Sequence, residues 1–167
     1  CQPRLPISDH CGVSAWKALN ITCCGVLTIA DSGSAKSRVT VSDGPDGKVV
    51  VITGAASGIG RALAVDIGRR GALLALSDID ADGLAETGRL AEAAGAREVR
   101  TDLLDVADRA AFAAYAAAVA AHFGRVNVIV NNAGVALSGD FEHLGYDDLE
   151  WIVGINFWGV VHGTKEF

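Results

Sequence analysis

A glycine-rich turn between an apolar run and a helix-like pattern constrains the fold more than any other feature. Apolar residues 49–52 lead into Thr53 to Gly60, where three glycines follow the spacing TGxxxGxG. Gly54 permits the backbone angles of a sharp turn, Gly58 lets a phosphate approach the main chain, and Gly60 allows the next helix to pack closely. The pattern predicts a strand, a turn and a helix whose first N–H groups face a diphosphate.

An acidic residue at a suitable distance supports this interpretation. Glycines also end strands for steric reasons alone, and the turn by itself does not identify a ligand. A dinucleotide site carries a further signal: an acid about 20 residues further on, at the end of the second strand, which binds the adenosine ribose. Asp78 follows the mostly apolar stretch 72–77. Asp78 also fits a solvated turn in Asp78-Ile79-Asp80, but its distance from the glycines favours ribose binding.

Composition excludes several other classes of protein. Of the 167 residues, 50% are hydrophobic and 20% charged, which indicates a globular chain. A net charge of −6 without a basic stripe argues against nucleic acid as a partner, and no apolar run could span a membrane. All four cysteines precede residue 25 and fit no zinc pattern, so we expect no metal site. Their absence elsewhere favours the cytoplasm.

The chain divides into two parts of different character. Residues 1–44 are irregular, and we expect an extension without regular structure. Their apolar stretch 19–30, followed by small residues, leaves a signal-peptide core as the alternative, and Asn20-Ile21-Thr22 is formally a glycosylation sequon. From residue 45 to 167, strand and helix patterns alternate, as in a single nucleotide-binding domain.

This alternation predicts an α/β fold with a Rossmann-type doubly wound parallel sheet between two helix layers, giving three αβα layers. The predicted strand order is 3-2-1-4, with the fourth strand apolar and buried on both faces. The predicted strands are 49–53, 73–77, 98–102 and 126–130, and the predicted helices are 59–70, 81–94, 108–123 and 147 to the end.

Four elements in order make residues 46–167 resemble the cofactor-binding half of the short-chain dehydrogenase/reductase family. They are the TGxxxGxG turn, Asp78, the pair Asp105-Val106 that borders the adenine in this family, and the motif Asn131-Asn132-Ala133-Gly134. The glycine spacing is that of the simple branch, because the extended branch carries TGxxGxxG. The resemblance implies an NAD-dependent oxidoreductase that transfers a hydride between NAD(H) and a carbonyl or secondary alcohol.

The resemblance also implies the residues of the site. Asn156 matches an asparagine that, in this family, holds a water linking the catalytic lysine to solvent; a satisfied core amide is the alternative. We expect NAD rather than NADP, because Asp78 would repel a 2′-phosphate. The residues expected to bind the cofactor are Thr53, Gly54, Ser57, Gly58, Ile59, Gly60, Asp78, Ile79, Asp105, Val106, Asn132, Ala133 and Gly134.

The family's catalytic Ser and Tyr-x-x-x-Lys have no match. Tyr115 is followed four residues later by Val119, and Tyr146 by Glu150. We therefore expect a domain truncated on its C-terminal side, inactive alone, from a parent that acts on small alcohols or ketones and forms homo-oligomers. The alternative is a catalytically inactive relative that binds a nucleotide or a partner.

Overall fold

The computed structural model describes residues 44–167. The expectations for residues 1–43, which concern the irregular extension, the cysteines, the signal-like stretch and the sequon at Asn20, lie outside the described residues. Within the described part, no helix combines the length and the apolar character that a membrane crossing requires.

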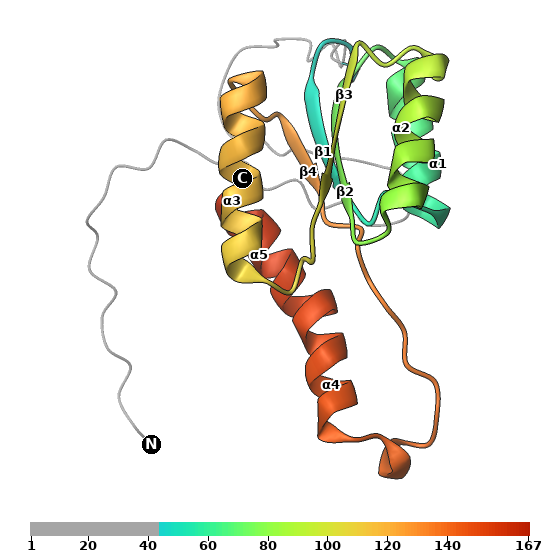
Figure 1. Cartoon of the computed structure of the whole chain (residues 1–167), viewed down its shortest axis with the longest axis vertical. Helices are drawn as coiled ribbons and strands as arrows, with labels where there is room; N and C mark the ends of the chain where they lie inside the picture. Colours follow the sequence, from blue (N-terminus) through green and yellow to red (C-terminus); the bar gives the residue numbers. More distant parts are fainter. Residues whose placement is uncertain (1–43) are drawn as a thin grey trace, which may run out of the picture. The chain divides into compact units, whose positions relative to one another are not determined.

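Four parallel strands form one sheet in the order β3-β2-β1-β4, which confirms the predicted order (Figure 1). The central strand β1 pairs with β2 on one side and with β4 on the other, so that Val51 lies between Ala75 and Ile129. The strand bounds are Val49–Thr53 for β1, Leu73–Asp78 for β2, Glu98–Leu103 for β3 and Val128–Val130 for β4.

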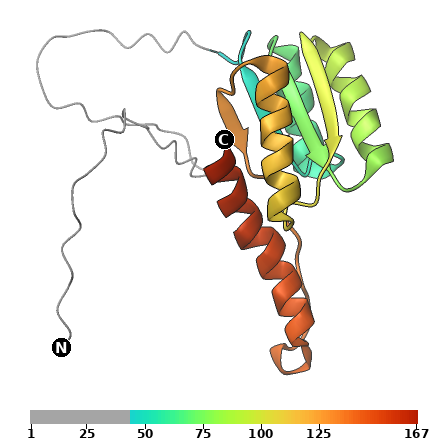
Figure 2. The same cartoon turned by 60° about the vertical axis from the view of Figure 1, so that its left-hand side comes forward.

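Helices cover both faces of this sheet (Figures 1 and 2). Helices α1 (Gly58–Arg69) and α2 (Ala81–Ala94) lie on one face, and α3 (Arg109–Phe123) lies on the other beside the last helix, α5 (Gly159–Glu166). The three layers confirm the predicted fold class. The long connection after β4 contains a 3₁₀ turn, η1 (Phe141–His143).

The helix predicted from residue 147 onward is present, but its middle is not α-helical. It consists of α4 (Tyr146–Val153), a π-helical turn η2 (Gly154–Trp158) and α5 (Gly159–Glu166). Val153 and Trp158 keep right-handed helical angles at the two junctions, so the backbone runs on without a break. Single π turns inside helices are rare and frequently mark functional sites.

The helix ends follow local signals in the sequence. Asp80 and Asp108 cap the N-termini of α2 and α3 by accepting backbone N–H bonds. Gly95 and Gly124 end the same helices with positive φ angles of 121° and 76°, which glycine adopts at low cost. These four residues explain why the predicted bounds of α2 and α3 hold to within one residue.

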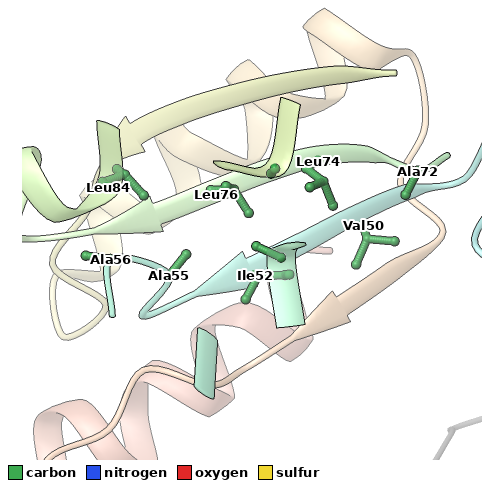
Figure 3. Packing of buried hydrophobic residues seen from close by; sticks show 10 residues of the cluster. Val50, Ile52, Ala55, Ala56, Ala72, Leu74, Leu76 and Leu84 are labelled. Atoms are coloured by element: carbon green, nitrogen blue, oxygen red, sulfur yellow. The ribbon is translucent and has the colours of Figure 1, made fainter. Parts of the chain in front are cut away.

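The core lies on both faces of the central strands. On one face Val50, Ile52 and Leu74 pack with residues of α1 and α2 (Figure 3). On the other face Val51 packs with Phe112 and further residues of α3. Each fully buried side chain of this size contributes about 1.5–3 kcal/mol, so β1 and β2 anchor the turns that follow them.

The fourth strand is shorter and less buried than predicted. It begins at Val128 rather than Val126, and its three residues are half-buried. Asn127 interrupts the apolar run, and its side-chain Oδ1, not its backbone carbonyl, accepts the Val49 N–H at 2.9 Å. Within the described residues β4 pairs only with β1, so its other edge has no strand to cover it.

Candidate functional site

A pocket of about 470 Å³ lies at the carboxyl edge of the sheet. This volume is within the range of small-molecule and cofactor sites, and the edge is where doubly wound sheets bind ligands. The turns after β1, β2 and β3, the loop after β4 and the helix α4 supply its walls. Of the expected cofactor-binding residues, all except Thr53 and Gly60 line it: Gly54, Ser57, Gly58, Ile59, Asp78, Ile79, Asp105, Val106, Asn132, Ala133 and Gly134.

The glycine turn has the conformation that its sequence predicts. Gly54 and Gly58 have φ angles of +67° and +52°, in the left-handed region that favours glycine. A Cβ on Gly54 would lie 2.7 Å from the Cα of Ala133, and a Cβ on Gly60 would overlap the Gly54 carbonyl oxygen. A Cβ on Gly58 would meet nothing within 4 Å, so space beside this glycine is open.

Thr53 and Asn132 join the turn after β1 to the loop after β4. The buried Thr53 hydroxyl accepts the backbone N–H groups of Asn132 and Ala133, both at 3.1 Å. In return, the Asn132 side chain donates to the carbonyls of Thr53 and Gly54, both at 3.0 Å. Thr53 and Gly60 thus support the walls of the pocket from behind without lining it.

The N-terminus of α1 opens onto this pocket. Its first residues, Gly58 and Ile59, and its N-cap, Ser57, all line the pocket and are exposed. Ser57 makes no side-chain cap within the described residues, and the first turn contains no acid. The early N–H groups of a helix have no partner within it, and they carry partial positive charge. An anionic group is therefore the ligand that this end favours.

Two carboxylates face the pocket from neighbouring turns. Asp78 is fixed by backbone N–H groups of Ala56 at 2.8 Å, Ile79 at 2.7 Å and Asp80 at 3.1 Å. Its two oxygens keep acceptor capacity for a ligand, since a carboxylate offers about four lone-pair sites. Asp105 accepts the Ala107 N–H at 2.9 Å and is exposed. Among the described residues that line the pocket, none is Lys, Arg or His.

Asn156 lies in the π turn η2, close to the pocket but not on its lining. Its Oδ1 accepts the Val135 N–H at 2.9 Å, and its Nδ2 donates to the Val135 carbonyl at 2.8 Å. Both ends of the amide are therefore satisfied, yet the side chain is exposed rather than in the core. Through Val135, Asn156 fixes the loop that carries Ala133 and Gly134.

Five lining residues were not predicted from the sequence. Trp151 and Ile155 are four residues apart on the last helix, a spacing that puts both side chains on one face and was available as a signal. Trp151 is 48% exposed and also lines the pocket. The other three residues, Leu104, Ala107 and Val135, belong to motif-flanking positions without a distinctive side chain.

Neither tyrosine is placed for proton exchange in the pocket. Tyr115 is 5% exposed in the core beneath the sheet, and Tyr146 is 85% exposed; neither lines the pocket. Burial raises the pKa of the Tyr115 hydroxyl far above its ordinary value, although the neighbouring Ser77 hydroxyl opposes the shift. Residues 44–167 contain no group of three or more His, Cys, Asp or Glu side chains that could hold a metal ion.

Comparison with known proteins places this geometry in a family. The family model described as short chain dehydrogenase matches residues 48–167. The protein SadH of Mycobacterium tuberculosis is 57% identical over 122 residues, which cover 73% of this chain and 44% of that protein. The 11-beta-hydroxysteroid dehydrogenase-like 6 of Arabidopsis thaliana is 44% identical over 137 residues, covering 77% of this chain and 40% of that protein.

A solved structure gives the same result. A short-chain dehydrogenase/reductase of Burkholderia phymatum, crystallised in complex with NAD, is 42% identical and superposes with a TM-score of 0.71. The match covers 75% of this chain and 44% of that one, so the chain spans less than half the length of this relative and of SadH. The family model covers every element from β1 to α5, and the chain belongs to the short-chain dehydrogenase family.

Proposed function

We propose that the pocket binds NAD and that the protein is an NAD-dependent oxidoreductase, which transfers a hydride between NAD(H) and a carbonyl or secondary alcohol. The observation that carries this proposal is the convergence of an uncapped helix N-terminus, a left-handed glycine turn and the fixed carboxylate of Asp78 on one pocket. A diphosphate and a ribose are the groups that such donors and such an acceptor bind. When bound, the nicotinamide supplies the hydride chemistry.

Each wall of the pocket takes a defined part of the proposed cofactor. The N–H groups at the start of α1, with Gly54 and Gly58 beside them, meet the diphosphate. Asp78 and the Ile79 main chain meet the adenosine ribose, and Asp105 with Val106 borders the adenine. Asn132, Ala133 and Gly134 flank the nicotinamide ribose. Thr53 and Gly60 hold these walls in register through the contacts described above.

The charges around the pocket favour NAD over NADP. Asp78 and Asp105 are the charged side chains among its described lining residues, and both are negative. A 2′-phosphate near Asp78 would meet like-charge repulsion of about 1 kcal/mol or more at a partly solvated site. The relative from Burkholderia phymatum, crystallised with NAD, supports the same choice.

We further propose that Asn156 belongs to the active site and keeps its geometry through Val135. The two hydrogen bonds of its side chain hold the loop that flanks the proposed nicotinamide position. The proton exchange that accompanies hydride transfer is not assigned to Tyr115 or Tyr146, because neither lines the pocket and neither is followed by Lys four residues later.

Association between copies is a further part of the proposal. Trp151, Val153, Phe157, Trp158 and Val160 are exposed apolar side chains, and all lie on the last helix. Exposed apolar side chains gathered on one helix favour an interaction site, and we infer a homo-oligomer that pairs through this helix. The second candidate function, a relative that binds partners without catalysis, draws on the same surface. We place the protein in the cytoplasm on the distribution of its cysteines alone.

Turnover by the full-length protein tests the proposal. The assay offers a panel of secondary alcohols with NAD or NADP, and of ketones with the reduced cofactors. We expect turnover with at least one substrate pair and a clear preference for NAD. Binding of NAD without turnover on a broad panel would favour the partner-binding candidate, whereas failure to bind either nucleotide would refute the proposed NAD-dependent function.

A further inference from the structure

Arg61 belongs to α1 but does not line the pocket, and its side chain donates hydrogen bonds to both α2 and the glycine turn. Its Nε donates to the Thr87 hydroxyl of α2 at 2.9 Å, and its Nη2 donates to the Gly83 carbonyl at 3.2 Å. The same Nη2 donates to the Ala56 carbonyl in the glycine turn. One guanidinium therefore ties the turn after β1 to the first turns of α2.

The groups that the Arg61 side chain contacts are themselves held in place. Thr87 is fully buried, and its hydroxyl donates to the Gly83 carbonyl at 3.0 Å. A Cβ on Gly83 would lie 2.9 Å from the Ala56 carbonyl oxygen, so α2 and the turn touch through their backbones. Figure 3 shows Ala56 after β1, on the side of the sheet where Leu84 of α2 also packs.

Both peptide groups that flank Ala56 are fixed by this arrangement. On one side the Ala56 N–H donates to Asp78 at 2.8 Å, and on the other the Ala56 carbonyl accepts from Arg61. The carbonyl of Ala56 and the N–H of Ser57 share one planar trans peptide, in which the two groups point in opposite directions. Because the carbonyl points toward α2, the Ser57 N–H points away from α2, and Ser57 lines the pocket.

We propose that Arg61 is a positioning residue for the adenosine side of the nucleotide site. By holding the Ala56 carbonyl against α2, Arg61 sets the direction of the Ser57 N–H and the position of the Asp78 carboxylate, which the Ala56 N–H contacts. The proposal rests on the function proposed above, since it assigns to Arg61 the placement of two groups that NAD would contact. It also explains why a cation so near the turn does not offer its charge to a 2′-phosphate: all its assigned donors face α2 and the Ala56 carbonyl.

Equilibrium binding of NAD and NADP to the full-length protein tests this role. Arg61→Met keeps the aliphatic stem and removes every donor, and Thr87→Val removes one anchor at nearly constant volume. Arg69→Met is the matched control, because Arg69 lies on the same helix but pairs with Asp66 at the surface. We expect Arg61→Met to weaken NAD about tenfold and NADP by about threefold or less, since NADP does not profit from Asp78. Thr87→Val should follow in the same direction, Arg61→Lys should recover part of the loss, and Arg69→Met should change neither affinity.

Hydrogen exchange of the Ala56 amide, measured without nucleotide, separates this inference from the proposed function. Arg61→Met should speed exchange at Ala56, whereas Arg69→Met should not. An unmodified protein that binds NAD, together with an Arg61→Met variant that keeps the wild-type ratio of NAD to NADP affinity, would overturn the positioning role alone. Failure of the unmodified protein to bind either nucleotide would refute the proposed function and this role together. If Arg61→Met does not fold, Thr87→Val decides by the same ratio.

Discussion

The walls of the pocket are built in two different ways. On the side of β1, α1 and α2, backbones touch directly, and a Cβ on Gly60 or Gly83 would have no room. On the side of β4 and α4, the strand is half-buried and Trp151, which lines the pocket, is 48% exposed. Phe157 and Trp158, in the adjoining turn η2, are exposed but do not line the pocket. The first wall is closed by its own contacts, whereas the second offers surface for further contacts.

This difference separates two kinds of specificity. Where backbones touch at glycines, the chain can adopt only one arrangement. Such a wall suits a ligand group that does not vary, such as a diphosphate. A half-buried wall with large side chains adapts more readily to substrates or partner chains. We therefore expect substitutions in the first wall to affect folding and nucleotide binding strongly, and those in the second to affect association.

Among substitutions at the pocket walls, the largest effect is expected at the closed wall. Gly60→Ala places a methyl group on the Gly54 carbonyl and beside the Asn132 amide, neither of which can move without disturbing the turn. We expect a loss of about 3 kcal/mol in the free energy of unfolding, at the upper end of typical overpacking costs. Urea denaturation measures it. Gly44→Ala is the control, because nothing lies within 4 Å of its added Cβ. A loss no larger than that of the control would contradict the closed wall.

Removing the link between the two walls should have the next largest effect. Asn132→Ala deletes two side-chain hydrogen bonds to the turn, and we expect a loss of about 2 kcal/mol. Asn127→Ala deletes one side-chain bond to Val49 at the far end of β4 and should cost about 1 kcal/mol. Chemical denaturation of both variants gives the comparison. If Asn127→Ala proved the more costly, the link at the pocket would not be the stronger one.

The buried tyrosine gives a pH-dependent effect on the α3 face. Burial raises the pKa of Tyr115 above its ordinary value of 10.0, so the folded state keeps a proton that the unfolded state loses. Stability is therefore complete below pH 10 and falls above it, by about 1.4 kcal/mol per pH unit from this residue. Tyr115→Phe should remove that slope. Parallel slopes for the variant and the unmodified protein between pH 10 and 11 would show that the hydroxyl is not held neutral.

The smallest effect on folding is expected at the open wall. Phe157 is 56% exposed, and Phe157→Ala should cost about 0.5 kcal/mol in the stability of a single copy. It should nonetheless weaken association, which sedimentation of the full-length protein measures. Phe112→Ala, at a fully buried position of α3, is the contrast and should cost about 3–5 kcal/mol. An unchanged oligomer with Phe157→Ala would argue against pairing through this helix.

The same two walls explain what could be predicted from the sequence. The glycine turn and the bounds of α2 and α3 depend on contacts over a few residues, so local patterns predicted them correctly. The role of Asp78 at the ribose stays a prediction. The start of β4 was predicted two residues too early, at Val126 instead of Val128. At Asn127 a side-chain oxygen accepts the Val49 N–H, and the apolar neighbours of Asn127 give no sign of this contact.

Other features depend on contacts between distant segments. The pairing of Asn156 with Val135 and the place of Trp151 on the pocket arise from the path of the long loop after β4, for which the sequence contains no period. The contact of Arg61 with Thr87 likewise joins two helices, and neither residue carries a signal of it. Sequence motifs indicate contacts between residues that are close along the chain. Contacts between distant segments can be identified only once the fold is known.

Competitive binding of NAD and NADP to the full-length protein tests the central claim most directly. Titration calorimetry on the unmodified protein and on Asp78→Ala yields four affinities under one set of conditions. We expect the unmodified protein to favour NAD by about tenfold or more, which corresponds to 1.4 kcal/mol, and Asp78→Ala to lose most of that preference. Equal affinity of the unmodified protein for the two nucleotides, or a preference that survives in Asp78→Ala, would contradict the assignment of Asp78 to the adenosine ribose.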